Sequence, residues 1–359
     1  MMARMEHIIG ALGCLLCLAA LASCSTIDDD LSKCPDPQEE QEATLDYELR
    51  LVTNMTTEVQ TQMSAQTDVA LAAMLYGHLS TIFTDFAKDV NLSFYDTQGD
   101  SVRLYHDRHV MNASERSYTL YIPRQKYMHL AVANIEDDPV VHLENDKNCH
   151  DAVLRQIDSD TINSHTTGIF TARQLMEMIE GIDQTFNVKL YMANCSAMLV
   201  VDPNGHDTSN MRVFTTGFAT AFHIADSVYE YKTPSPMIRT TRLDPDESGF
   251  VGFCSVNFPS REPSSSAAPK TTRTVIETTE PFIAQPGQEA LWEFHVFVPQ
   301  PDGSVTKSVL GIMEPLRAGQ LKIVRCKLGD DGGIVSSDQS VAVSVTLNWN
   351  NGGNYDPVL

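Results

Sequence analysis

Residues 292–312 read WEFHVFVPQPDGSVTKSVLGI, and this stretch decides the fold class. Its first part places a large apolar side chain at every second position: Trp292, Phe294, Val296 and Val298. That period is typical of a strand with one buried face. The turn signal Pro301-Asp302-Gly303-Ser304 comes next, and the apolar segment 305–312 follows it. The stretch therefore predicts a β-hairpin.

Alternating apolar positions recur on both sides of this hairpin. They are Leu45, Tyr47, Leu49 and Leu51 near the N-terminus, and Val341, Val343, Val345, Leu347 and Trp349 near the C-terminus. Further strands are predicted around residues 90–94, 118–122, 128–132, 188–201 and 250–258. Many short strands separated by turns are typical of β-sandwiches or barrels.

Three other segments need separate predictions. Residues 69–86 carry one apolar stripe at helical spacing, formed by Leu71, Met74, Leu75, Leu79, Ile82, Phe83 and Phe86, and we expect this helix to pack against the core. Residues 136–168 are polar and predict long loops. Residues 171–179 fit either a strand or a short helix, because Thr171 and Gln174 form a capping box.

Length and charge limit the classes of protein. The 359 residues suggest two domains, and we expect two tandem β-sandwiches at 44–184 and 185–359, the helix being inserted in the first. The net charge of −22 repels phosphate, so the sequence excludes nucleic acid as a partner and argues against a polybasic membrane-surface protein.

The N-terminus predicts a lipoprotein signal peptide over residues 1–23. An uncharged apolar run from Ile8 to Ala22 ends in Leu21-Ala22-Ser23-Cys24, where small residues precede a cysteine. The Cys24 thiol would take the lipid, and acyl chains such as palmitate would anchor the protein without a transmembrane helix. The alternative is a plain secretory signal with a chance cysteine. Residues 24–43 are expected to form an acidic tether.

Five further cysteines follow Cys24, so at least one is unpaired or pairs between chains. The candidate disulfides are Cys34–Cys149 and Cys195–Cys254, with Cys326 left over, although buried free thiols are an equal alternative.

No catalytic chemistry is visible in the sequence. HExxH, GxSxG, P-loop and dinucleotide-binding motifs do not occur, and the eleven histidines are scattered. We therefore expect no enzyme, no catalytic or metal-ligating residues, no cofactor and no small-molecule substrate.

The order of features resembles a known family. The segment Asp30-Leu31-Ser32-Lys33-Cys34-Pro35 directly after the lipobox, the stretch 90–96 with its Gly99 turn, and the segment 118–134 are similar to the fimbrial anchor family (FimB-type) of type V pili. The strand 188–201 and the end of the chain from Pro315 to Trp349 also fit this family.

The resemblance implies two transthyretin-like β-sandwich domains in a pilus subunit held to the outer membrane by lipid and exposed on the cell surface as part of a fimbrium. It implies β-strand exchange with a fimbrial stalk subunit, for which residues 341–349 are the candidate donor strand; the alternative is a resident core strand. Anchors keep the first strand, whereas stalk subunits lose it to an Arg-specific protease, for which Arg50 is the disfavoured candidate site. The alternatives are a surface lipoprotein that binds glycan or peptide through Trp292 or Trp349, or a protease-matured stalk or tip subunit.

Overall fold

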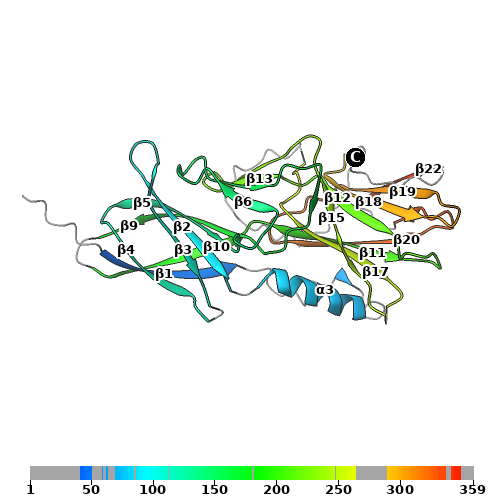
Figure 1. The fold of residues 1–359 in the computed structure, drawn as a ribbon, viewed down its shortest axis with the longest axis horizontal. Coiled ribbons are helices and arrows are strands. Elements are labelled where there is room, and N and C mark those ends of the chain that lie inside the picture. The colour runs from blue at the N-terminus through cyan, green and yellow to red at the C-terminus, as the bar shows by residue number, and fades with distance from the viewer. Residues whose placement is uncertain are drawn as a thin grey trace, which may run out of the picture.

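The computed structural model describes residues 41–50, 59, 62–63, 69–84, 86–112, 114–179, 182–246, 248–263, 289–336 and 341–348. Within these ranges the fold is almost entirely β, with one extended helix, α3 (Val69–Ile82), and the strands form four sheets (Figure 1). The predicted all-β class is confirmed. No helix in the described ranges is long and apolar enough to cross a membrane.

The N-terminal part is built on a seven-stranded sheet. In spatial order its strands are β3 (Arg103–Val110), β2 (Asp89–Asp96), β5 (Lys126–Ala133), β9 (Phe170–Glu177), β10 (Gln184–Met192), β1 (Gln41–Arg50) and β4 (Ser117–Ile122). Only two residue pairs join β9 to β10, and side chains of β3 and β4 touch although these strands stand at the two ends of the order. The sheet therefore folds over at β9–β10 into a sandwich around one apolar core.

The C-terminal part contains a five-stranded and a six-stranded sheet. The first consists of β16 (Thr241–Leu243), β17 (Val251–Asn257), β11 (Cys195–Asp202), β20 (Leu321–Leu328) and β21 (Ile334–Val335). The second consists of β22 (Val341–Asn348), β19 (Val305–Ile312), β18 (Trp292–Pro299), β12 (Arg212–Thr216), β15 (Met237–Arg239) and β8 (Thr161–Asn163). The predicted hairpin is confirmed as β18–β19, paired from Trp292↔Ile312 to Pro299↔Val305.

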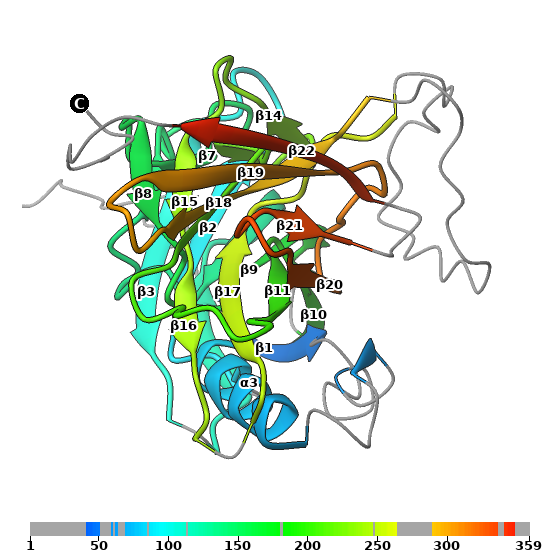
Figure 2. The same cartoon turned by 90° about the vertical axis from the view of Figure 1, so that its right-hand side faces the viewer.

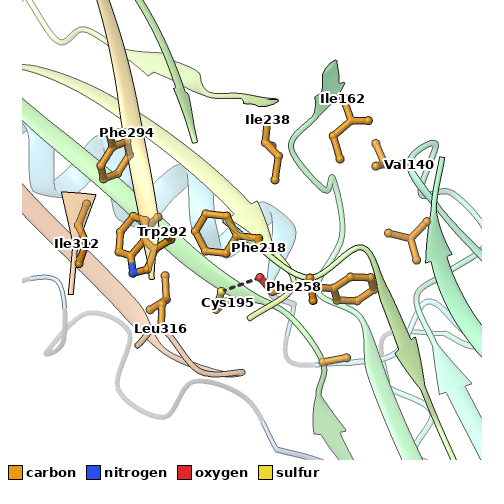
Figure 3. Close-up of a cluster of buried hydrophobic side chains, with 14 of the residues drawn as sticks. Val140, Ile162, Cys195, Phe218, Ile238, Phe258, Trp292, Phe294, Ile312 and Leu316 are labelled. Carbon is orange, nitrogen blue, oxygen red and sulfur yellow. Dashed lines mark hydrogen bonds between the residues drawn. The ribbon is translucent and has the colours of Figure 1, made fainter. Parts of the chain in front are cut away.

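Trp292 anchors the core of this C-terminal part (Figure 3). Its ring lies 5.3 Å from that of Phe218 and 5.2 Å from that of Phe294, and its Nε1 donates a hydrogen bond to Glu314 O. Because Trp292 is 1% exposed, it cannot stack on a glycan at the surface, and that alternative for Trp292 is wrong.

The chain crosses between the two parts later than expected. Residues 188–201 are two strands, β10 and β11, because Ala193 and Asn194 interrupt the run and carry it from one sheet to another. Asn194 is fully buried; its Nδ2 donates to Thr167 O and its Oδ1 accepts from Ile169 N. The expected boundary at 184/185 falls at the start of β10, which still belongs to the N-terminal sheet.

Other strands also tie the two parts together. The segment expected to be loops contains β8 and two strands of a small fourth sheet, ordered β14 (Val228–Glu230), β13 (Ala221–His223), β7 (Val153–Gln156) and β6 (Val141–Glu144). β8 pairs with β15, and β7 pairs with β13. These strands are too short for their periodicity to show in the sequence. The ambiguous segment 171–179 forms strand β9 and not a helix.

The helix α3 follows β1 in the chain but packs on the C-terminal part. The helix lies beside β16 and β17 (Figure 2). Its side chains Leu71, Leu75 and Leu79 are buried, whereas Met74 of the predicted stripe is exposed. At the end of the helix, Gly168 N donates to Ile82 O. The predicted amphipathic helix is confirmed; it packs on the five-stranded sheet, and its buried leucines share one apolar cluster with Leu45 and Leu92 of the first sandwich.

Gly252 on β17 sets how closely α3 approaches this sheet. A Cβ at this position would lie 2.3 Å from Met198 Cε and 3.0 Å from Leu71 Cδ1. We expect Gly252→Val to lower the free energy of unfolding by about 1–3 kcal/mol, as for other overpacked cores. Thermal melts of Gly252→Val and of Gly249→Val would check this, because a Cβ at Gly249 meets nothing within 4 Å. Equal melting temperatures for the two variants would contradict the close packing of α3.

Candidate functional site

The first strand lies inside the N-terminal sheet, in a slot between β10 and β4. It runs parallel to β10 over eight residue pairs, from Ala43↔Gln184 to Arg50↔Tyr191. It runs antiparallel to β4 over six pairs, from Gln41↔Ile122 to Asp46↔Ser117. Since β4 stands at the end of the strand order, β1 is its sheet partner within the described residues. We call this position the first-strand slot.

The slot is filled by side chains at alternate positions. Ala43, Leu45 and Tyr47 are buried, and Leu45 is 0% exposed. They join Leu120, Val188 and Leu190 in the core of the sandwich. Burying a leucine side chain contributes about 1.5–3 kcal/mol, so β1 provides a substantial part of the stability of this sandwich.

A polar cluster of Asp107, His109 and Tyr118 connects β3 to β4, the two end strands of the sheet, beside the slot. Tyr118 Oη donates a hydrogen bond of 2.5 Å to Asp107 Oδ2, and the rings of Tyr118 and His109 lie 4.1 Å apart. This hydrogen bond, followed by burial, raises the pKa of Tyr118 to about 12. Burial, with Asp107 nearby, raises the pKa of Tyr47 well above its usual value. Both phenols are therefore neutral, and the cluster joins β3 to β4 without backbone pairing.

The candidate donor strand is resident in the structure. Val341, Val343, Val345 and Leu347 lie in β22, which pairs antiparallel with β19 from Ile312↔Val341 to Val305↔Asn348. β22 is an end strand of the six-stranded sheet in the part of the chain that the structure describes; its other edge pairs with no described strand, and β21 lies close to it. Trp349 lies outside the described residues.

The remaining predicted residues lie in different places. Arg50 is the last residue of β1, and its backbone pairs in register with Tyr191. Cys24 and Cys34 lie outside the described residues. No group of three or more His, Cys, Asp or Glu side chains that could hold a metal ion occurs within the described ranges.

The predicted disulfide Cys195–Cys254 is wrong, because both residues are free thiols. Cys195 pairs with Asn257, and Cys254 pairs with Met198. An offset of three residues on adjacent strands puts the side chains on opposite faces of the sheet. Cys195 accordingly packs in the Trp292 core and Cys254 beneath α3. Cys149 is also a free, buried thiol in the structure.

We expect Cys149, Cys195, Cys254 and Cys326 to be unreactive toward a thiol reagent in the folded protein, because all four are buried. Burial also raises the pKa of Cys254 to about 12, which leaves almost no thiolate at neutral pH. Reagent titration before and after denaturation, followed by peptide mapping without reductant, measures this. Recovery of a peptide linked through Cys195 and Cys254 would contradict the register of β11 and β17.

The sequence did not reveal two parts of this arrangement. The Asp107–Tyr118 contact joins residues on separate strands whose spacing carries no motif. Asn194 did leave a signal, because it is the one amide in the run from Met192 to Val201, in which Ser196 is the other polar residue. A buried amide in such a run indicates a break between two strands.

Comparison with known proteins gives structural likenesses only. No protein-family model and no curated protein matches the chain. A candidate polysaccharide-binding protein from Bacteroides thetaiotaomicron is similar with a TM-score of 0.47 and 9% identity, covering 84% of this chain and 98% of that one. A candidate adhesin from Bacteroides ovatus matches with a TM-score of 0.47 and 8% identity, over 85% and 95% of the two chains. The fimbrial anchor protein Mfa2 from Porphyromonas gingivalis matches with a TM-score of 0.44 and 12% identity, over 86% and 97%.

Proposed function

We propose that this chain is a lipid-anchored structural subunit of a surface fimbrium, and that it is the anchor which joins the fibre to the outer membrane and limits its length. The occupied first-strand slot carries this proposal. A subunit that accepts a strand from its neighbour needs an open slot beside a sheet edge. Here β1 fills the slot on both sides, so a strand from another subunit has no place to pair there.

The lipobox supports the membrane end of the proposal. Cys24 follows Leu21-Ala22-Ser23, and the acidic tether leads from it to β1 at Gln41. β1 is paired with β10 and β4, and the segment before it starts at the lipid-modified Cys24. β1 would therefore connect the bilayer to the core of the sandwich. The role is structural and not enzymatic.

β22 supports the fibre end. Releasing β22 would break only one ladder of backbone hydrogen bonds, because β22 pairs with β19 alone among the described strands. Its residues Val341, Val343, Val345 and Leu347, with Trp349 beyond, are the candidate donor strand for the stalk subunit.

A deletion strain tests the proposal. Cells that lack this chain should shed fimbriae into the medium, and the wild-type gene should restore their attachment. Cys24→Ser should fail to restore it, whereas the matched variant Cys34→Ser should succeed. Fibres that stay on the deletion cells would contradict the anchor role.

Identifying the N-terminus of the native protein distinguishes an anchor from a stalk subunit. Mass spectrometry of protein from cells should find lipid on Cys24 in a chain that keeps residues 41–50. An unlipidated chain starting at Leu51 would instead identify a protease-matured subunit cut after Arg50.

A further inference from the structure

We propose that the pole of the N-terminal sandwich where β1 begins rests on the lipid bilayer through an apolar patch, Tyr121, Ile179 and Ile182. This inference rests on the proposed lipid anchoring and adds a surface to it. The three side chains are 51–56% exposed. Two large aliphatic side chains together with a tyrosine suit the lipid–water interface.

Strand pairing gathers these residues at one pole. Tyr121 is the second-last residue of β4 and pairs with Glu42 of β1. The next pair along β1 joins Ala43 to Gln184 at the start of β10. Ile179 and Ile182 lie in the connection that leads from β9 into β10. With a spacing of about 4.8 Å between strands, roughly 10 Å separates Tyr121 from this connection.

The proposed lipid attachment site is close to this pole along the chain. Seventeen residues, from Cys24 to Glu40, separate the lipid attachment site from Gln41, the first residue of β1. Seventeen residues span at most about 60 Å when fully extended, which limits how far Gln41 can lie from the bilayer. In Figure 1 the start of β1 lies at the same end of the elongated molecule as β4 and β9, and the β18–β19 turn lies at the other end. A weak contact is favoured at the high effective concentration that such a tether imposes.

The charges at this pole favour an apolar contact over an electrostatic one. Glu42 and Asp183 are exposed, Lys126 is paired with Glu177 at 3.1 Å, and Arg124 lies half-buried in the turn between β4 and β5. This rim has no surplus of positive charge that would attract anionic headgroups. The contact should therefore be as strong on zwitterionic vesicles as on vesicles that contain an anionic lipid.

Vesicle binding with an artificial anchor tests the proposal. The chain from Ser25 onward, with Cys34→Ser and an N-terminal histidine tag, is held on phosphatidylcholine vesicles by a nickel-chelating lipid. A polarity-sensitive probe is attached to Asp183→Cys, or to Asp302→Cys in the β18–β19 turn as the matched control; the other thiols are buried. We expect the emission at position 183 to rise at least twofold and shift to the blue on vesicles, and the emission at position 302 to stay constant.

Two further experiments, a double substitution in the patch and a change of lipid composition, show whether the patch contacts the bilayer. Ile179→Ser with Ile182→Ser should abolish the change at position 183, and adding phosphatidylglycerol should leave it unaltered. The proposal is overturned by a constant emission at 183, by a change that survives the double substitution, or by one that requires phosphatidylglycerol. It is also overturned by the same change at high protein concentration without vesicles, which would indicate a second copy of the chain. The tag replaces the natural lipid, so these results do not depend on the modification of Cys24, which mass spectrometry tests separately.

Discussion

Stripping β1 from the folded protein is expected to unfold the N-terminal sandwich, and a peptide of residues 41–50 is expected to restore it. β1 supplies Leu45 and Tyr47 to the core and pairs with β10 and β4 on its two sides. Buried side chains of this size contribute about 1.5–3 kcal/mol each, and a whole domain is stable by only about 5–15 kcal/mol. A protease site placed within residues 52–57 allows cleavage after folding, and peptide exchange and thermal melts then measure the loss and the recovery.

Variants of the peptide show whether recovery depends on the buried positions of β1 and not on its half-exposed ones. Leu45→Asp changes a buried position and should prevent binding, whereas Asp46→Asn changes the neighbouring half-exposed position and should not. A stripped protein that keeps the melting temperature of the intact chain would show that β1 is not needed, and the closed-slot argument for an anchor would then fail.

Acid is expected to destabilise the fold strongly between pH 6.5 and 4. His129 and His165 are buried, and burial lowers the pKa of each imidazole to about 4. In the unfolded chain these residues have a pKa of about 6.5, so below that pH the unfolded state binds more protons than the folded state. Stability therefore falls as the pH decreases, by about 3 kcal/mol for each histidine at pH 4. Urea unfolding at several pH values measures the slope.

The variant His129→Leu isolates the contribution of one histidine to this effect. The ring of His129 stacks on Phe94 at 4.3 Å, its Nδ1 lies 3.2 Å from Ser93 O, and its Nε2 is buried without a hydrogen-bond partner. Leucine removes the unsatisfied Nε2 but also the contact of Nδ1 with Ser93 O, so the variant is judged by the pH slope of its stability and not by its stability at neutral pH. The variant should lose about 3 kcal/mol of the acid destabilisation at pH 4, which is the share of one such histidine, and His150→Leu, at an exposed position, is the matched control. An unchanged slope in His129→Leu would refute the assignment.

The sequence was a good guide wherever one face of a strand is buried. The alternation in residues 292–298 and 341–347 predicted β18 and β22, and the stripe from Leu71 to Phe83 predicted α3. Alternation fails where both faces are buried, as in β11, whose residues from Cys195 to Val201 are all buried. Strands of three or four residues, such as β8 and β13, are also too short to show a period.

The sequence also did not predict which strands and sheets lie next to one another. The pairing of β1 with β10 joins Ala43 to Gln184, far along the chain, and no local pattern encodes it. The stripe of α3 shows that one face is buried but not which sheet covers it. The disulfide prediction failed for the same reason, because two cysteines on adjacent strands are close only when the register puts them on one face.

The parallel pairing of β1 has a mechanical consequence. A load between the bilayer and the C-terminal sheets would enter the sandwich at Gln41 and pull β1 along its own axis. The eight pairs with β10 and the six pairs with β4 would then bear the tension together, in shear, and would not be peeled apart one after another. If the chain is anchored as proposed, the two ladders of β1 lie along the line on which the fibre would be pulled.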